Sequence, residues 1–131
     1  MRVVARIAAN MVLALALAGC YSVIKTPSIA SASVYGPHIS GGPLSAQEVA
    51  RLSSWMKAHD AGWRVLMETS QAPITMAIVM REPDGRQSSL NVFESKDGTA
   101  MVYFNAPSPA PPRQRYLLEA DVQTLRSAVG K

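Results

Sequence analysis

The clearest hydrophobic pattern in the chain begins after residue 44 and has the period of a helix. Val49, Leu52 and Met56 follow one another at spacings of three and four residues, which places their side chains along one stripe. Ser45 stands before this pattern as an N-cap, and Glu48 three residues later completes a capping box. The sequence therefore predicts a helix that begins directly after Ser45.

Four runs with strand character follow this helix, and short turns separate them. Two of the turns contain an Asp-Gly pair, which is a strong hairpin signal between β-rich runs. Connections this short cannot hold crossover helices, so the sheet is expected to be an antiparallel meander. The predicted strands cover residues 63–69, 74–82, 88–94 and 99–105.

A proline-rich stretch and a second amphipathic helix complete the pattern. Residues 107–112 are expected to form a surface loop that links the last strand to the last helix, although a ligand for another domain is an alternative role. The helix is expected at about residues 118–129, with Val122, Leu125 and Val129 facing inward. The predicted fold class is therefore α+β, with a helix, a four-stranded antiparallel meander sheet and a C-terminal helix in a domain at residues 44–131.

If both helices pack on the same face of this sheet, its other face must contact solvent or a partner. Apolar strand residues that lie outside the main core would then mark an interaction surface. The candidates for this surface are Leu66, Val79, Phe93 and Val102.

A different pattern opens the chain, where two positive charges precede a continuous apolar run. Arg2 and Arg6 are followed by residues 7–18, which are apolar except for Asn10, as in a secretory signal. A helix of this length spans about 18 Å, well short of the roughly 30 Å hydrocarbon layer of a bilayer. A stable transmembrane span is therefore not expected.

The run ends in Leu17-Ala18-Gly19-Cys20, which resembles the lipobox of bacterial lipoproteins. This resemblance implies that residues 1–19 form a signal peptide cut between Gly19 and Cys20. It also implies that the Cys20 sulfur carries a diacylglycerol and that the protein is held on a membrane by this lipid. A lipid attached to Cys20 is the one covalent group that we expect, and no other cofactor is expected.

The position after the cysteine bears on which membrane holds the protein. In lipoproteins of bacteria with two membranes, an aspartate there typically causes retention in the inner membrane, whereas this chain has Tyr21. The resemblance therefore favours the outer membrane, with the domain facing the periplasm. Residues 20–43 are rich in Ser, Ala, Gly and Pro and are expected to be the lipidated cysteine followed by a flexible tether.

Composition narrows the possible partners. Loss of the signal removes two arginines, so the formal net charge of +4 falls to +2, and the chain has no concentrated basic stripe with interleaved aromatic residues. Nucleic acid is therefore not an expected partner. Cys20 is the only cysteine, which rules out an intramolecular disulfide.

Candidate chemistry in the mature chain is sparse. A hydrolase would have to use His59 with Asp60 beside it or Glu68 further on, but a histidine in the last turn of a helix also has a structural explanation. Met76 and Met80 share a strand face and could bind Cu(I), but methionines at core spacing more commonly fill a core. We therefore predict no metal site and no catalytic residue.

These observations favour a non-enzymatic, membrane-anchored domain that binds another protein of the cell envelope. It would serve as an accessory subunit of a secretion or surface assembly, or as an inhibitor that protects the cell from a hydrolase or toxin. One alternative is a small periplasmic enzyme that acts on the cell wall, with His59 in its cleft. Another alternative is a structural tether or a carrier of a small ligand, whose identity the sequence leaves open.

Overall fold

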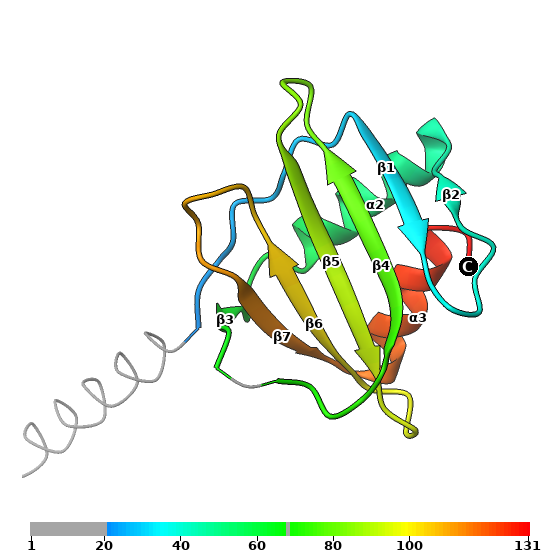
Figure 1. Cartoon of the computed structure of the whole chain (residues 1–131), viewed down its shortest axis with the longest axis vertical. Helices are drawn as coiled ribbons and strands as arrows, with labels where there is room; N and C mark the ends of the chain where they lie inside the picture. Colours follow the sequence, from blue (N-terminus) through cyan, green and yellow to red (C-terminus); the bar gives the residue numbers. More distant parts are fainter. Residues whose placement is uncertain (1–20, 68) are drawn as a thin grey trace, which may run out of the picture.

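The strands of the chain form one sheet, which Figure 1 shows in the computed structural model. The structure describes residues 21–67 and 69–131, and within them seven strands form one antiparallel sheet with two helices. In chain order the elements are β1 (Ser31–Tyr35), β2 (Gly42–Pro43), α2 (Ala46–Ala58), β3 (Arg64–Val65), β4 (Ile74–Arg81), β5 (Gln87–Glu94), β6 (Ala100–Asn105), β7 (Arg113–Leu117) and α3 (Glu119–Ala128). The spatial order of the strands is β2-β1-β4-β5-β6-β7-β3, and both helices lie on one face of the sheet.

The predicted four-stranded meander is therefore wrong, because strands β1, β2 and β7 were not expected and the sheet is larger. Strands β4 to β7 do run as a meander of antiparallel neighbours. β1 and β2 extend this meander beyond β4, while β3, reduced to two residues, pairs with β7 at the opposite edge. The proline-rich stretch consequently connects β6 to β7 rather than leading into the last helix.

The segment expected to be a flexible tether is largely part of the fold. Ser22 and Trp63 exchange two backbone hydrogen bonds, with N to O distances of 2.6 and 3.2 Å, and the Ile24 side chain is buried. β1 then pairs with β4 along its whole length. Its inward residues, Ala32 and Val34, are small, so this alternation was hidden in a Ser- and Ala-rich stretch. The folded unit thus begins well before residue 44.

The first helix starts as the sequence predicts. The Ser45 side chain accepts a hydrogen bond from the Glu48 backbone N–H at 3.1 Å, and the Glu48 carboxylate accepts from the Ser45 backbone N–H at 2.8 Å. This capping box satisfies two backbone donors at the start of the helix. The helix ends at Ala58, with His59 as its C-cap residue.

Both Asp-Gly hairpins predicted from the sequence are present. Gly85 and Gly98 adopt left-handed φ angles of 89° and 87°, which favour glycine because it has no Cβ. In the β5–β6 turn, the Asp97 carboxylate accepts hydrogen bonds from the backbone and hydroxyl of Thr99, and these bonds lower the pKa of Asp97. The two turns fix the register of the three central strands, β4, β5 and β6.

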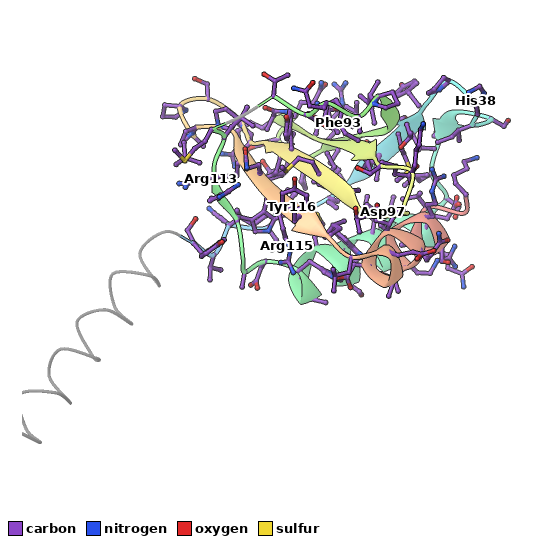
Figure 2. The ribbon with its side chains drawn as sticks, turned by 90° about the horizontal axis from the view of Figure 1, so that it is seen from below. His38, Phe93, Asp97, Arg113, Arg115 and Tyr116 are labelled. Carbon is purple, nitrogen blue, oxygen red and sulfur yellow. The ribbon has the colours of Figure 1, made fainter. Side chains whose placement is uncertain are left out.

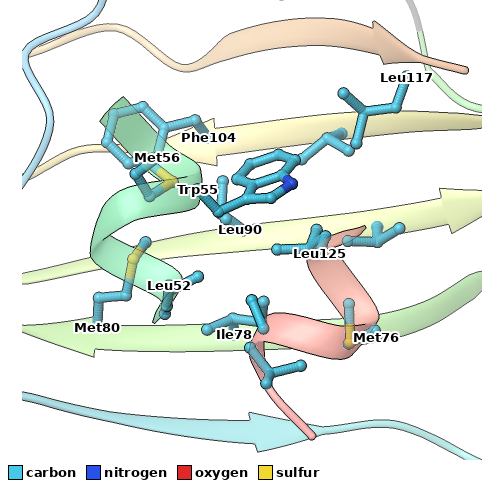
Figure 3. Packing of buried hydrophobic residues seen from close by; sticks show 14 of the residues in the cluster. Leu52, Trp55, Met56, Met76, Ile78, Met80, Leu90, Phe104, Leu117 and Leu125 are labelled. Atoms are coloured by element: carbon cyan, nitrogen blue, oxygen red, sulfur yellow. The ribbon is translucent and has the colours of Figure 1, made fainter. Parts of the chain in front are cut away.

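The hydrophobic core lies between the helices and one face of the sheet (Figure 3). Helix α2 contributes Leu52, Trp55 and Met56, all of which are buried. From α3, the predicted inward residues Val122, Leu125 and Val129 are all buried, which confirms that prediction. Most of the other core residues lie at alternate positions in the strands: Val34, Met76, Ile78, Met80, Leu90, Val92, Val102, Phe104 and Leu117.

An ion pair joins α3 to the sheet at the edge of this core. Arg126 donates two hydrogen bonds to the Glu94 carboxylate, at 2.9 and 2.6 Å, and both side chains are mostly buried. The hydrogen bonds from Arg126 hold the pKa of Glu94 below its ordinary value. This pair therefore fixes the helix on β5 with a charged contact as well as an apolar one.

Candidate functional site

The face of the sheet that the helices leave uncovered is the most distinctive surface of the described chain. Because side chains alternate along a strand, every residue next to a core residue points to this opposite side. In Figure 2 the helices lie below the sheet and Phe93 lies above it. We call this surface the open face, and define it as Ser31, Ser33, Tyr35, Ala77, Val79, Arg81, Gln87, Ser89, Asn91, Phe93, Tyr103 and Asn105.

Uncharged side chains make up most of the open face. Ser33, Val79, Ser89 and Asn105 form one row across four strands, and the Asn105 amide donates to the Ser89 hydroxyl at 3.4 Å. Among the residues that define this face, Arg81 alone carries a formal charge. Depletion of charged residues distinguishes the centre of protein interfaces from ordinary surface.

Part of the chain crosses the sheet at one end of this face. The Ser70 backbone N–H donates to the Tyr103 hydroxyl at 2.5 Å, and Tyr103 packs on Phe93 with ring centres 4.7 Å apart. Residues 69–72 line a small pocket of about 150 Å³ together with Met101, which is buried although it belongs to the uncovered side. The accessible part of the open face therefore lies over β1, β4 and β5.

The four residues predicted for an interaction surface fall in three places. Val79 and Phe93 are half-buried on the open face, where we expected them. Leu66 is half-buried in the segment after β3, and its backbone N–H donates to the Pro112 carbonyl. Val102 is fully buried on the helix-covered side, so its assignment to a surface is wrong. Its neighbours Met101 and Tyr103 are also large, so the sequence of β6 does not show which side faces the core.

His59, the candidate catalytic residue, is held between α2 and α3. Its Nδ1 lies 2.8 Å from the Trp55 carbonyl, its Nε2 lies 3.1 Å from the Asp121 carboxylate, and its ring stacks on the Trp55 indole at 4.0 Å. Both partners accept hydrogen bonds, so a ring nitrogen that carries a proton donates to the partner that it faces. Both ring nitrogens therefore contact groups of the fold itself.

The carboxylate beside His59 is not one of those proposed from the sequence. Asp121 occupies that place, 62 residues further along the chain, whereas Asp60 uses its backbone carbonyl to accept from the Ile24 N–H. Glu68 lies outside the described residues. The His59 contact joins the last turn of one helix to the first turn of the other, which is a structural role.

The proposed copper ligands are core residues. Met76 and Met80 are fully buried beneath the helices, on either side of Ile78, within the hydrophobic cluster. Within residues 21–67 and 69–131, no three His, Cys, Asp or Glu side chains gather closely enough to hold a metal ion.

The same ranges contain no helix with the length and apolar character needed to cross a bilayer. Gly19 and Cys20, the expected processing and lipidation site, lie outside these ranges.

A broad groove of about 570 Å³ lies on the outer surface between α2 and α3 and is lined by Arg51, Trp55, His59 and Asp121 among others. Several of its polar groups form hydrogen bonds within the fold, since the Trp55 indole N–H donates to Thr124 and Arg51 donates to the Ala128 carbonyl. This groove therefore includes charged side chains that contact their neighbours in the fold, in contrast to the nearly uncharged open face.

Comparison with protein-family models finds no match for this chain, and neither the curated proteins nor the solved structures yield one. Its class is therefore defined by its own features: a one-layer antiparallel sheet with helices on one side, preceded by a segment that resembles a lipoprotein signal.

Proposed function

We propose that this protein is a lipid-anchored component of the bacterial cell envelope that binds another envelope protein through the open face of its sheet and catalyses no reaction. The observation that carries the proposal is the contrast between the covered side of the sheet and the charge-poor open face. The lipobox at Leu17-Ala18-Gly19-Cys20 supports the anchor, and Tyr21 favours the outer membrane with the domain in the periplasm. An accessory subunit of an envelope assembly and an inhibitor protein are both compatible with this role.

The shape and size of the open face favour a protein as the ligand. Strands β4 and β5, of eight residues each, and β1, of five, lie about 4.8 Å apart and present an accessible area on the order of 300 Å². Small molecules bind in concave pockets that enclose most of their surface, which a flat sheet cannot do. An area on the order of 300 Å² per partner is below the roughly 800 Å² of a standard interface, so the complex is expected to be transient.

The anchor is tested by replacing the lipidated residue. A Cys20→Ser chain should lose signal cleavage and acylation, which mass spectrometry of the purified protein measures directly. If the Cys20→Ser protein is still cleaved and stays in the membrane fraction after a carbonate wash, the lipoprotein assignment is wrong.

The partner surface is tested by site-specific photo-crosslinking in cells. A photoreactive residue at Ser33 or Asn91 on the open face should give one dominant crosslinked protein. The same residue at Gln123, exposed on α3, serves as the matched control and should not give it. Equal crosslinking from Gln123 and from the open face would contradict the proposal.

A further inference from the structure

Exposed apolar side chains gather at the corner where the described chain begins. Across the described residues, eight large hydrophobic side chains are exposed, and five of these lie in the first described segment, in or just after β3, or in β7. Shared contacts place them together: Tyr21 and Tyr116 line the same depression of about 470 Å³, and Val65 pairs with Arg113 of β7. We call this group the anchor corner: Tyr21 (56% exposed), Val23 (67%), Val65 (49%), Met67 (80%) and Tyr116 (66%).

Positive charge surrounds these side chains. Arg64 and Arg115 line the same depression as the two tyrosines, and Arg113 lies with Val23 beside a smaller hollow. Tyrosine and arginine both combine an apolar body with a polar end, which suits them to the interface between lipid and water.

The corner is also firmly built. The Arg115 guanidinium donates hydrogen bonds to the carbonyls of His59 and Ala61, which fixes the loop between α2 and β3. The paired backbones of Ser22 and Trp63 hold the first described residues against this loop. The exposed side chains therefore stand on a fixed scaffold rather than on a free tail.

The length of chain between the expected lipid and this scaffold is very short. Cys20 is bonded directly to Tyr21, and two residues of fully extended chain span at most about 7 Å. A lipid on Cys20 would consequently bring the anchor corner to the surface of the bilayer, whereas a tether of residues 20–43 would have left it free.

The geometry points to a membrane-docking surface: the anchor corner lies in the headgroup layer of an anionic bilayer, with Tyr21, Tyr116 and Met67 inserted and Arg113 against lipid phosphates. This inference rests on the proposed lipid anchor, and it adds that the domain is oriented. The β3 edge faces the membrane, and β1 lies five strand spacings away, or about 24 Å. The accessible part of the open face is then held clear of the bilayer.

A fluorescent probe of depth tests this orientation with the full, lipidated chain in vesicles. Because the lipid occupies Cys20, an introduced cysteine is the one free thiol for an environment-sensitive NBD label. We expect NBD at Y116C, in vesicles with phosphatidylglycerol, to react with dithionite at least about tenfold more slowly than NBD at Q123C on α3. Equal reactivity at the two positions would overturn the docking surface.

A charge variant separates lipid binding from simple proximity. The R113E chain should lose most of the protection at position 116, whereas K96E, with the same change of charge in the exposed β5–β6 turn, should keep it. Protection that persists in R113E would overturn the role of Arg113. Protection found in cells but absent from pure lipid vesicles would also overturn the proposal, since a protein would then cover the corner.

Failure of the docking surface can be distinguished from failure of the proposed lipid anchor. Mass spectrometry of the same labelled sample reports whether Cys20 is acylated. An acylated chain with an accessible Y116C label refutes the docking surface alone, whereas a chain without the lipid refutes the anchor itself.

Discussion

The two sides of the sheet are built by the same strands and yet have opposite chemistry. In β4, Met76, Ile78 and Met80 point into the core, while the intervening Ala77 and Val79 point to the open face. One side is covered by helices and filled with large apolar side chains, and the other is uncovered and nearly uncharged. The covered side therefore provides most of the stability of the fold. Residues of the open face can consequently be substituted without loss of folding.

The largest expected change in stability comes from one of two neighbouring residues that lie on opposite sides of β4. Ile78→Ala, in the core, should lower the free energy of unfolding by about 2–5 kcal/mol. Val79→Ala, on the open face, should lower it by about 1 kcal/mol or less. Urea denaturation of the two purified variants measures both values, and similar losses would show that the open face is part of the core.

The next effect concerns the charged contact between the covered side and α3. Glu94→Gln should cost about 1–2 kcal/mol near pH 7, because it removes a charge from a paired and mostly buried carboxylate. Since Arg126 lowers the pKa of Glu94 in the folded state, the pair stabilises the protein at pH values above 4.5, the ordinary pKa of this carboxyl. This contribution should disappear as the pH falls through the lowered pKa.

The check is a pair of pH series. The free energy of unfolding of the parent and of Glu94→Gln should differ at pH 7 and converge below pH 4.5, the ordinary value for Glu94. A difference that stays constant over this range would mean that the ion pair does not stabilise the fold.

The smallest expected change in stability concerns two adjacent serines that lie on opposite sides of the sheet. Ser88 is buried on the covered side, and its hydroxyl finds no hydrogen-bond partner in the described part of the chain. Ser88→Ala should therefore raise the free energy of unfolding by about 0.5–1 kcal/mol, because a buried unsatisfied polar atom is removed. Ser89→Ala on the open face should be nearly neutral. Thermal unfolding of the two variants decides between these outcomes, and destabilisation by Ser88→Ala would contradict the assignment.

The sequence predicts those parts of the fold whose signals are local. Strands β4 and β5 were predicted to within one residue of their bounds, because alternation and an Asp-Gly turn agree there. The capping box of Ser45 and the inward residues of α3 follow from spacings within one or two helical turns. Each of these features depends on neighbours in the chain.

The missed strands lack a clear apolar alternation in the sequence. β1 pairs with residues more than 40 positions away, and its buried side chains are only Ala32 and Val34. β7 has the sequence Arg-Gln-Arg-Tyr-Leu, which has no apolar alternation, and Gln114 is buried because the chain after β3 covers it. Only the folded structure supplies that cover.

Local sequence signals likewise predict some residues of the candidate site and not others. Val79 and Phe93 could be placed on an open face because strand alternation predicts sides, whereas Val102 could not, since both of its neighbours are large. The contact between His59 and Asp121 joins two helices far apart in sequence and left no local signal. The anchor corner was missed for a related reason, because its residues come from three separate segments.

The most direct test of the central claim compares two arginine substitutions in a chain with a photoreactive residue at Asn91. Ser89→Arg, in the middle of the open face, should reduce capture of the crosslinked partner at least about tenfold, while leaving membrane attachment and the unfolding temperature unchanged. Gln123→Arg on the outer surface of α3 should leave capture unchanged. Full capture by Ser89→Arg together with loss of capture by Gln123→Arg would contradict the account.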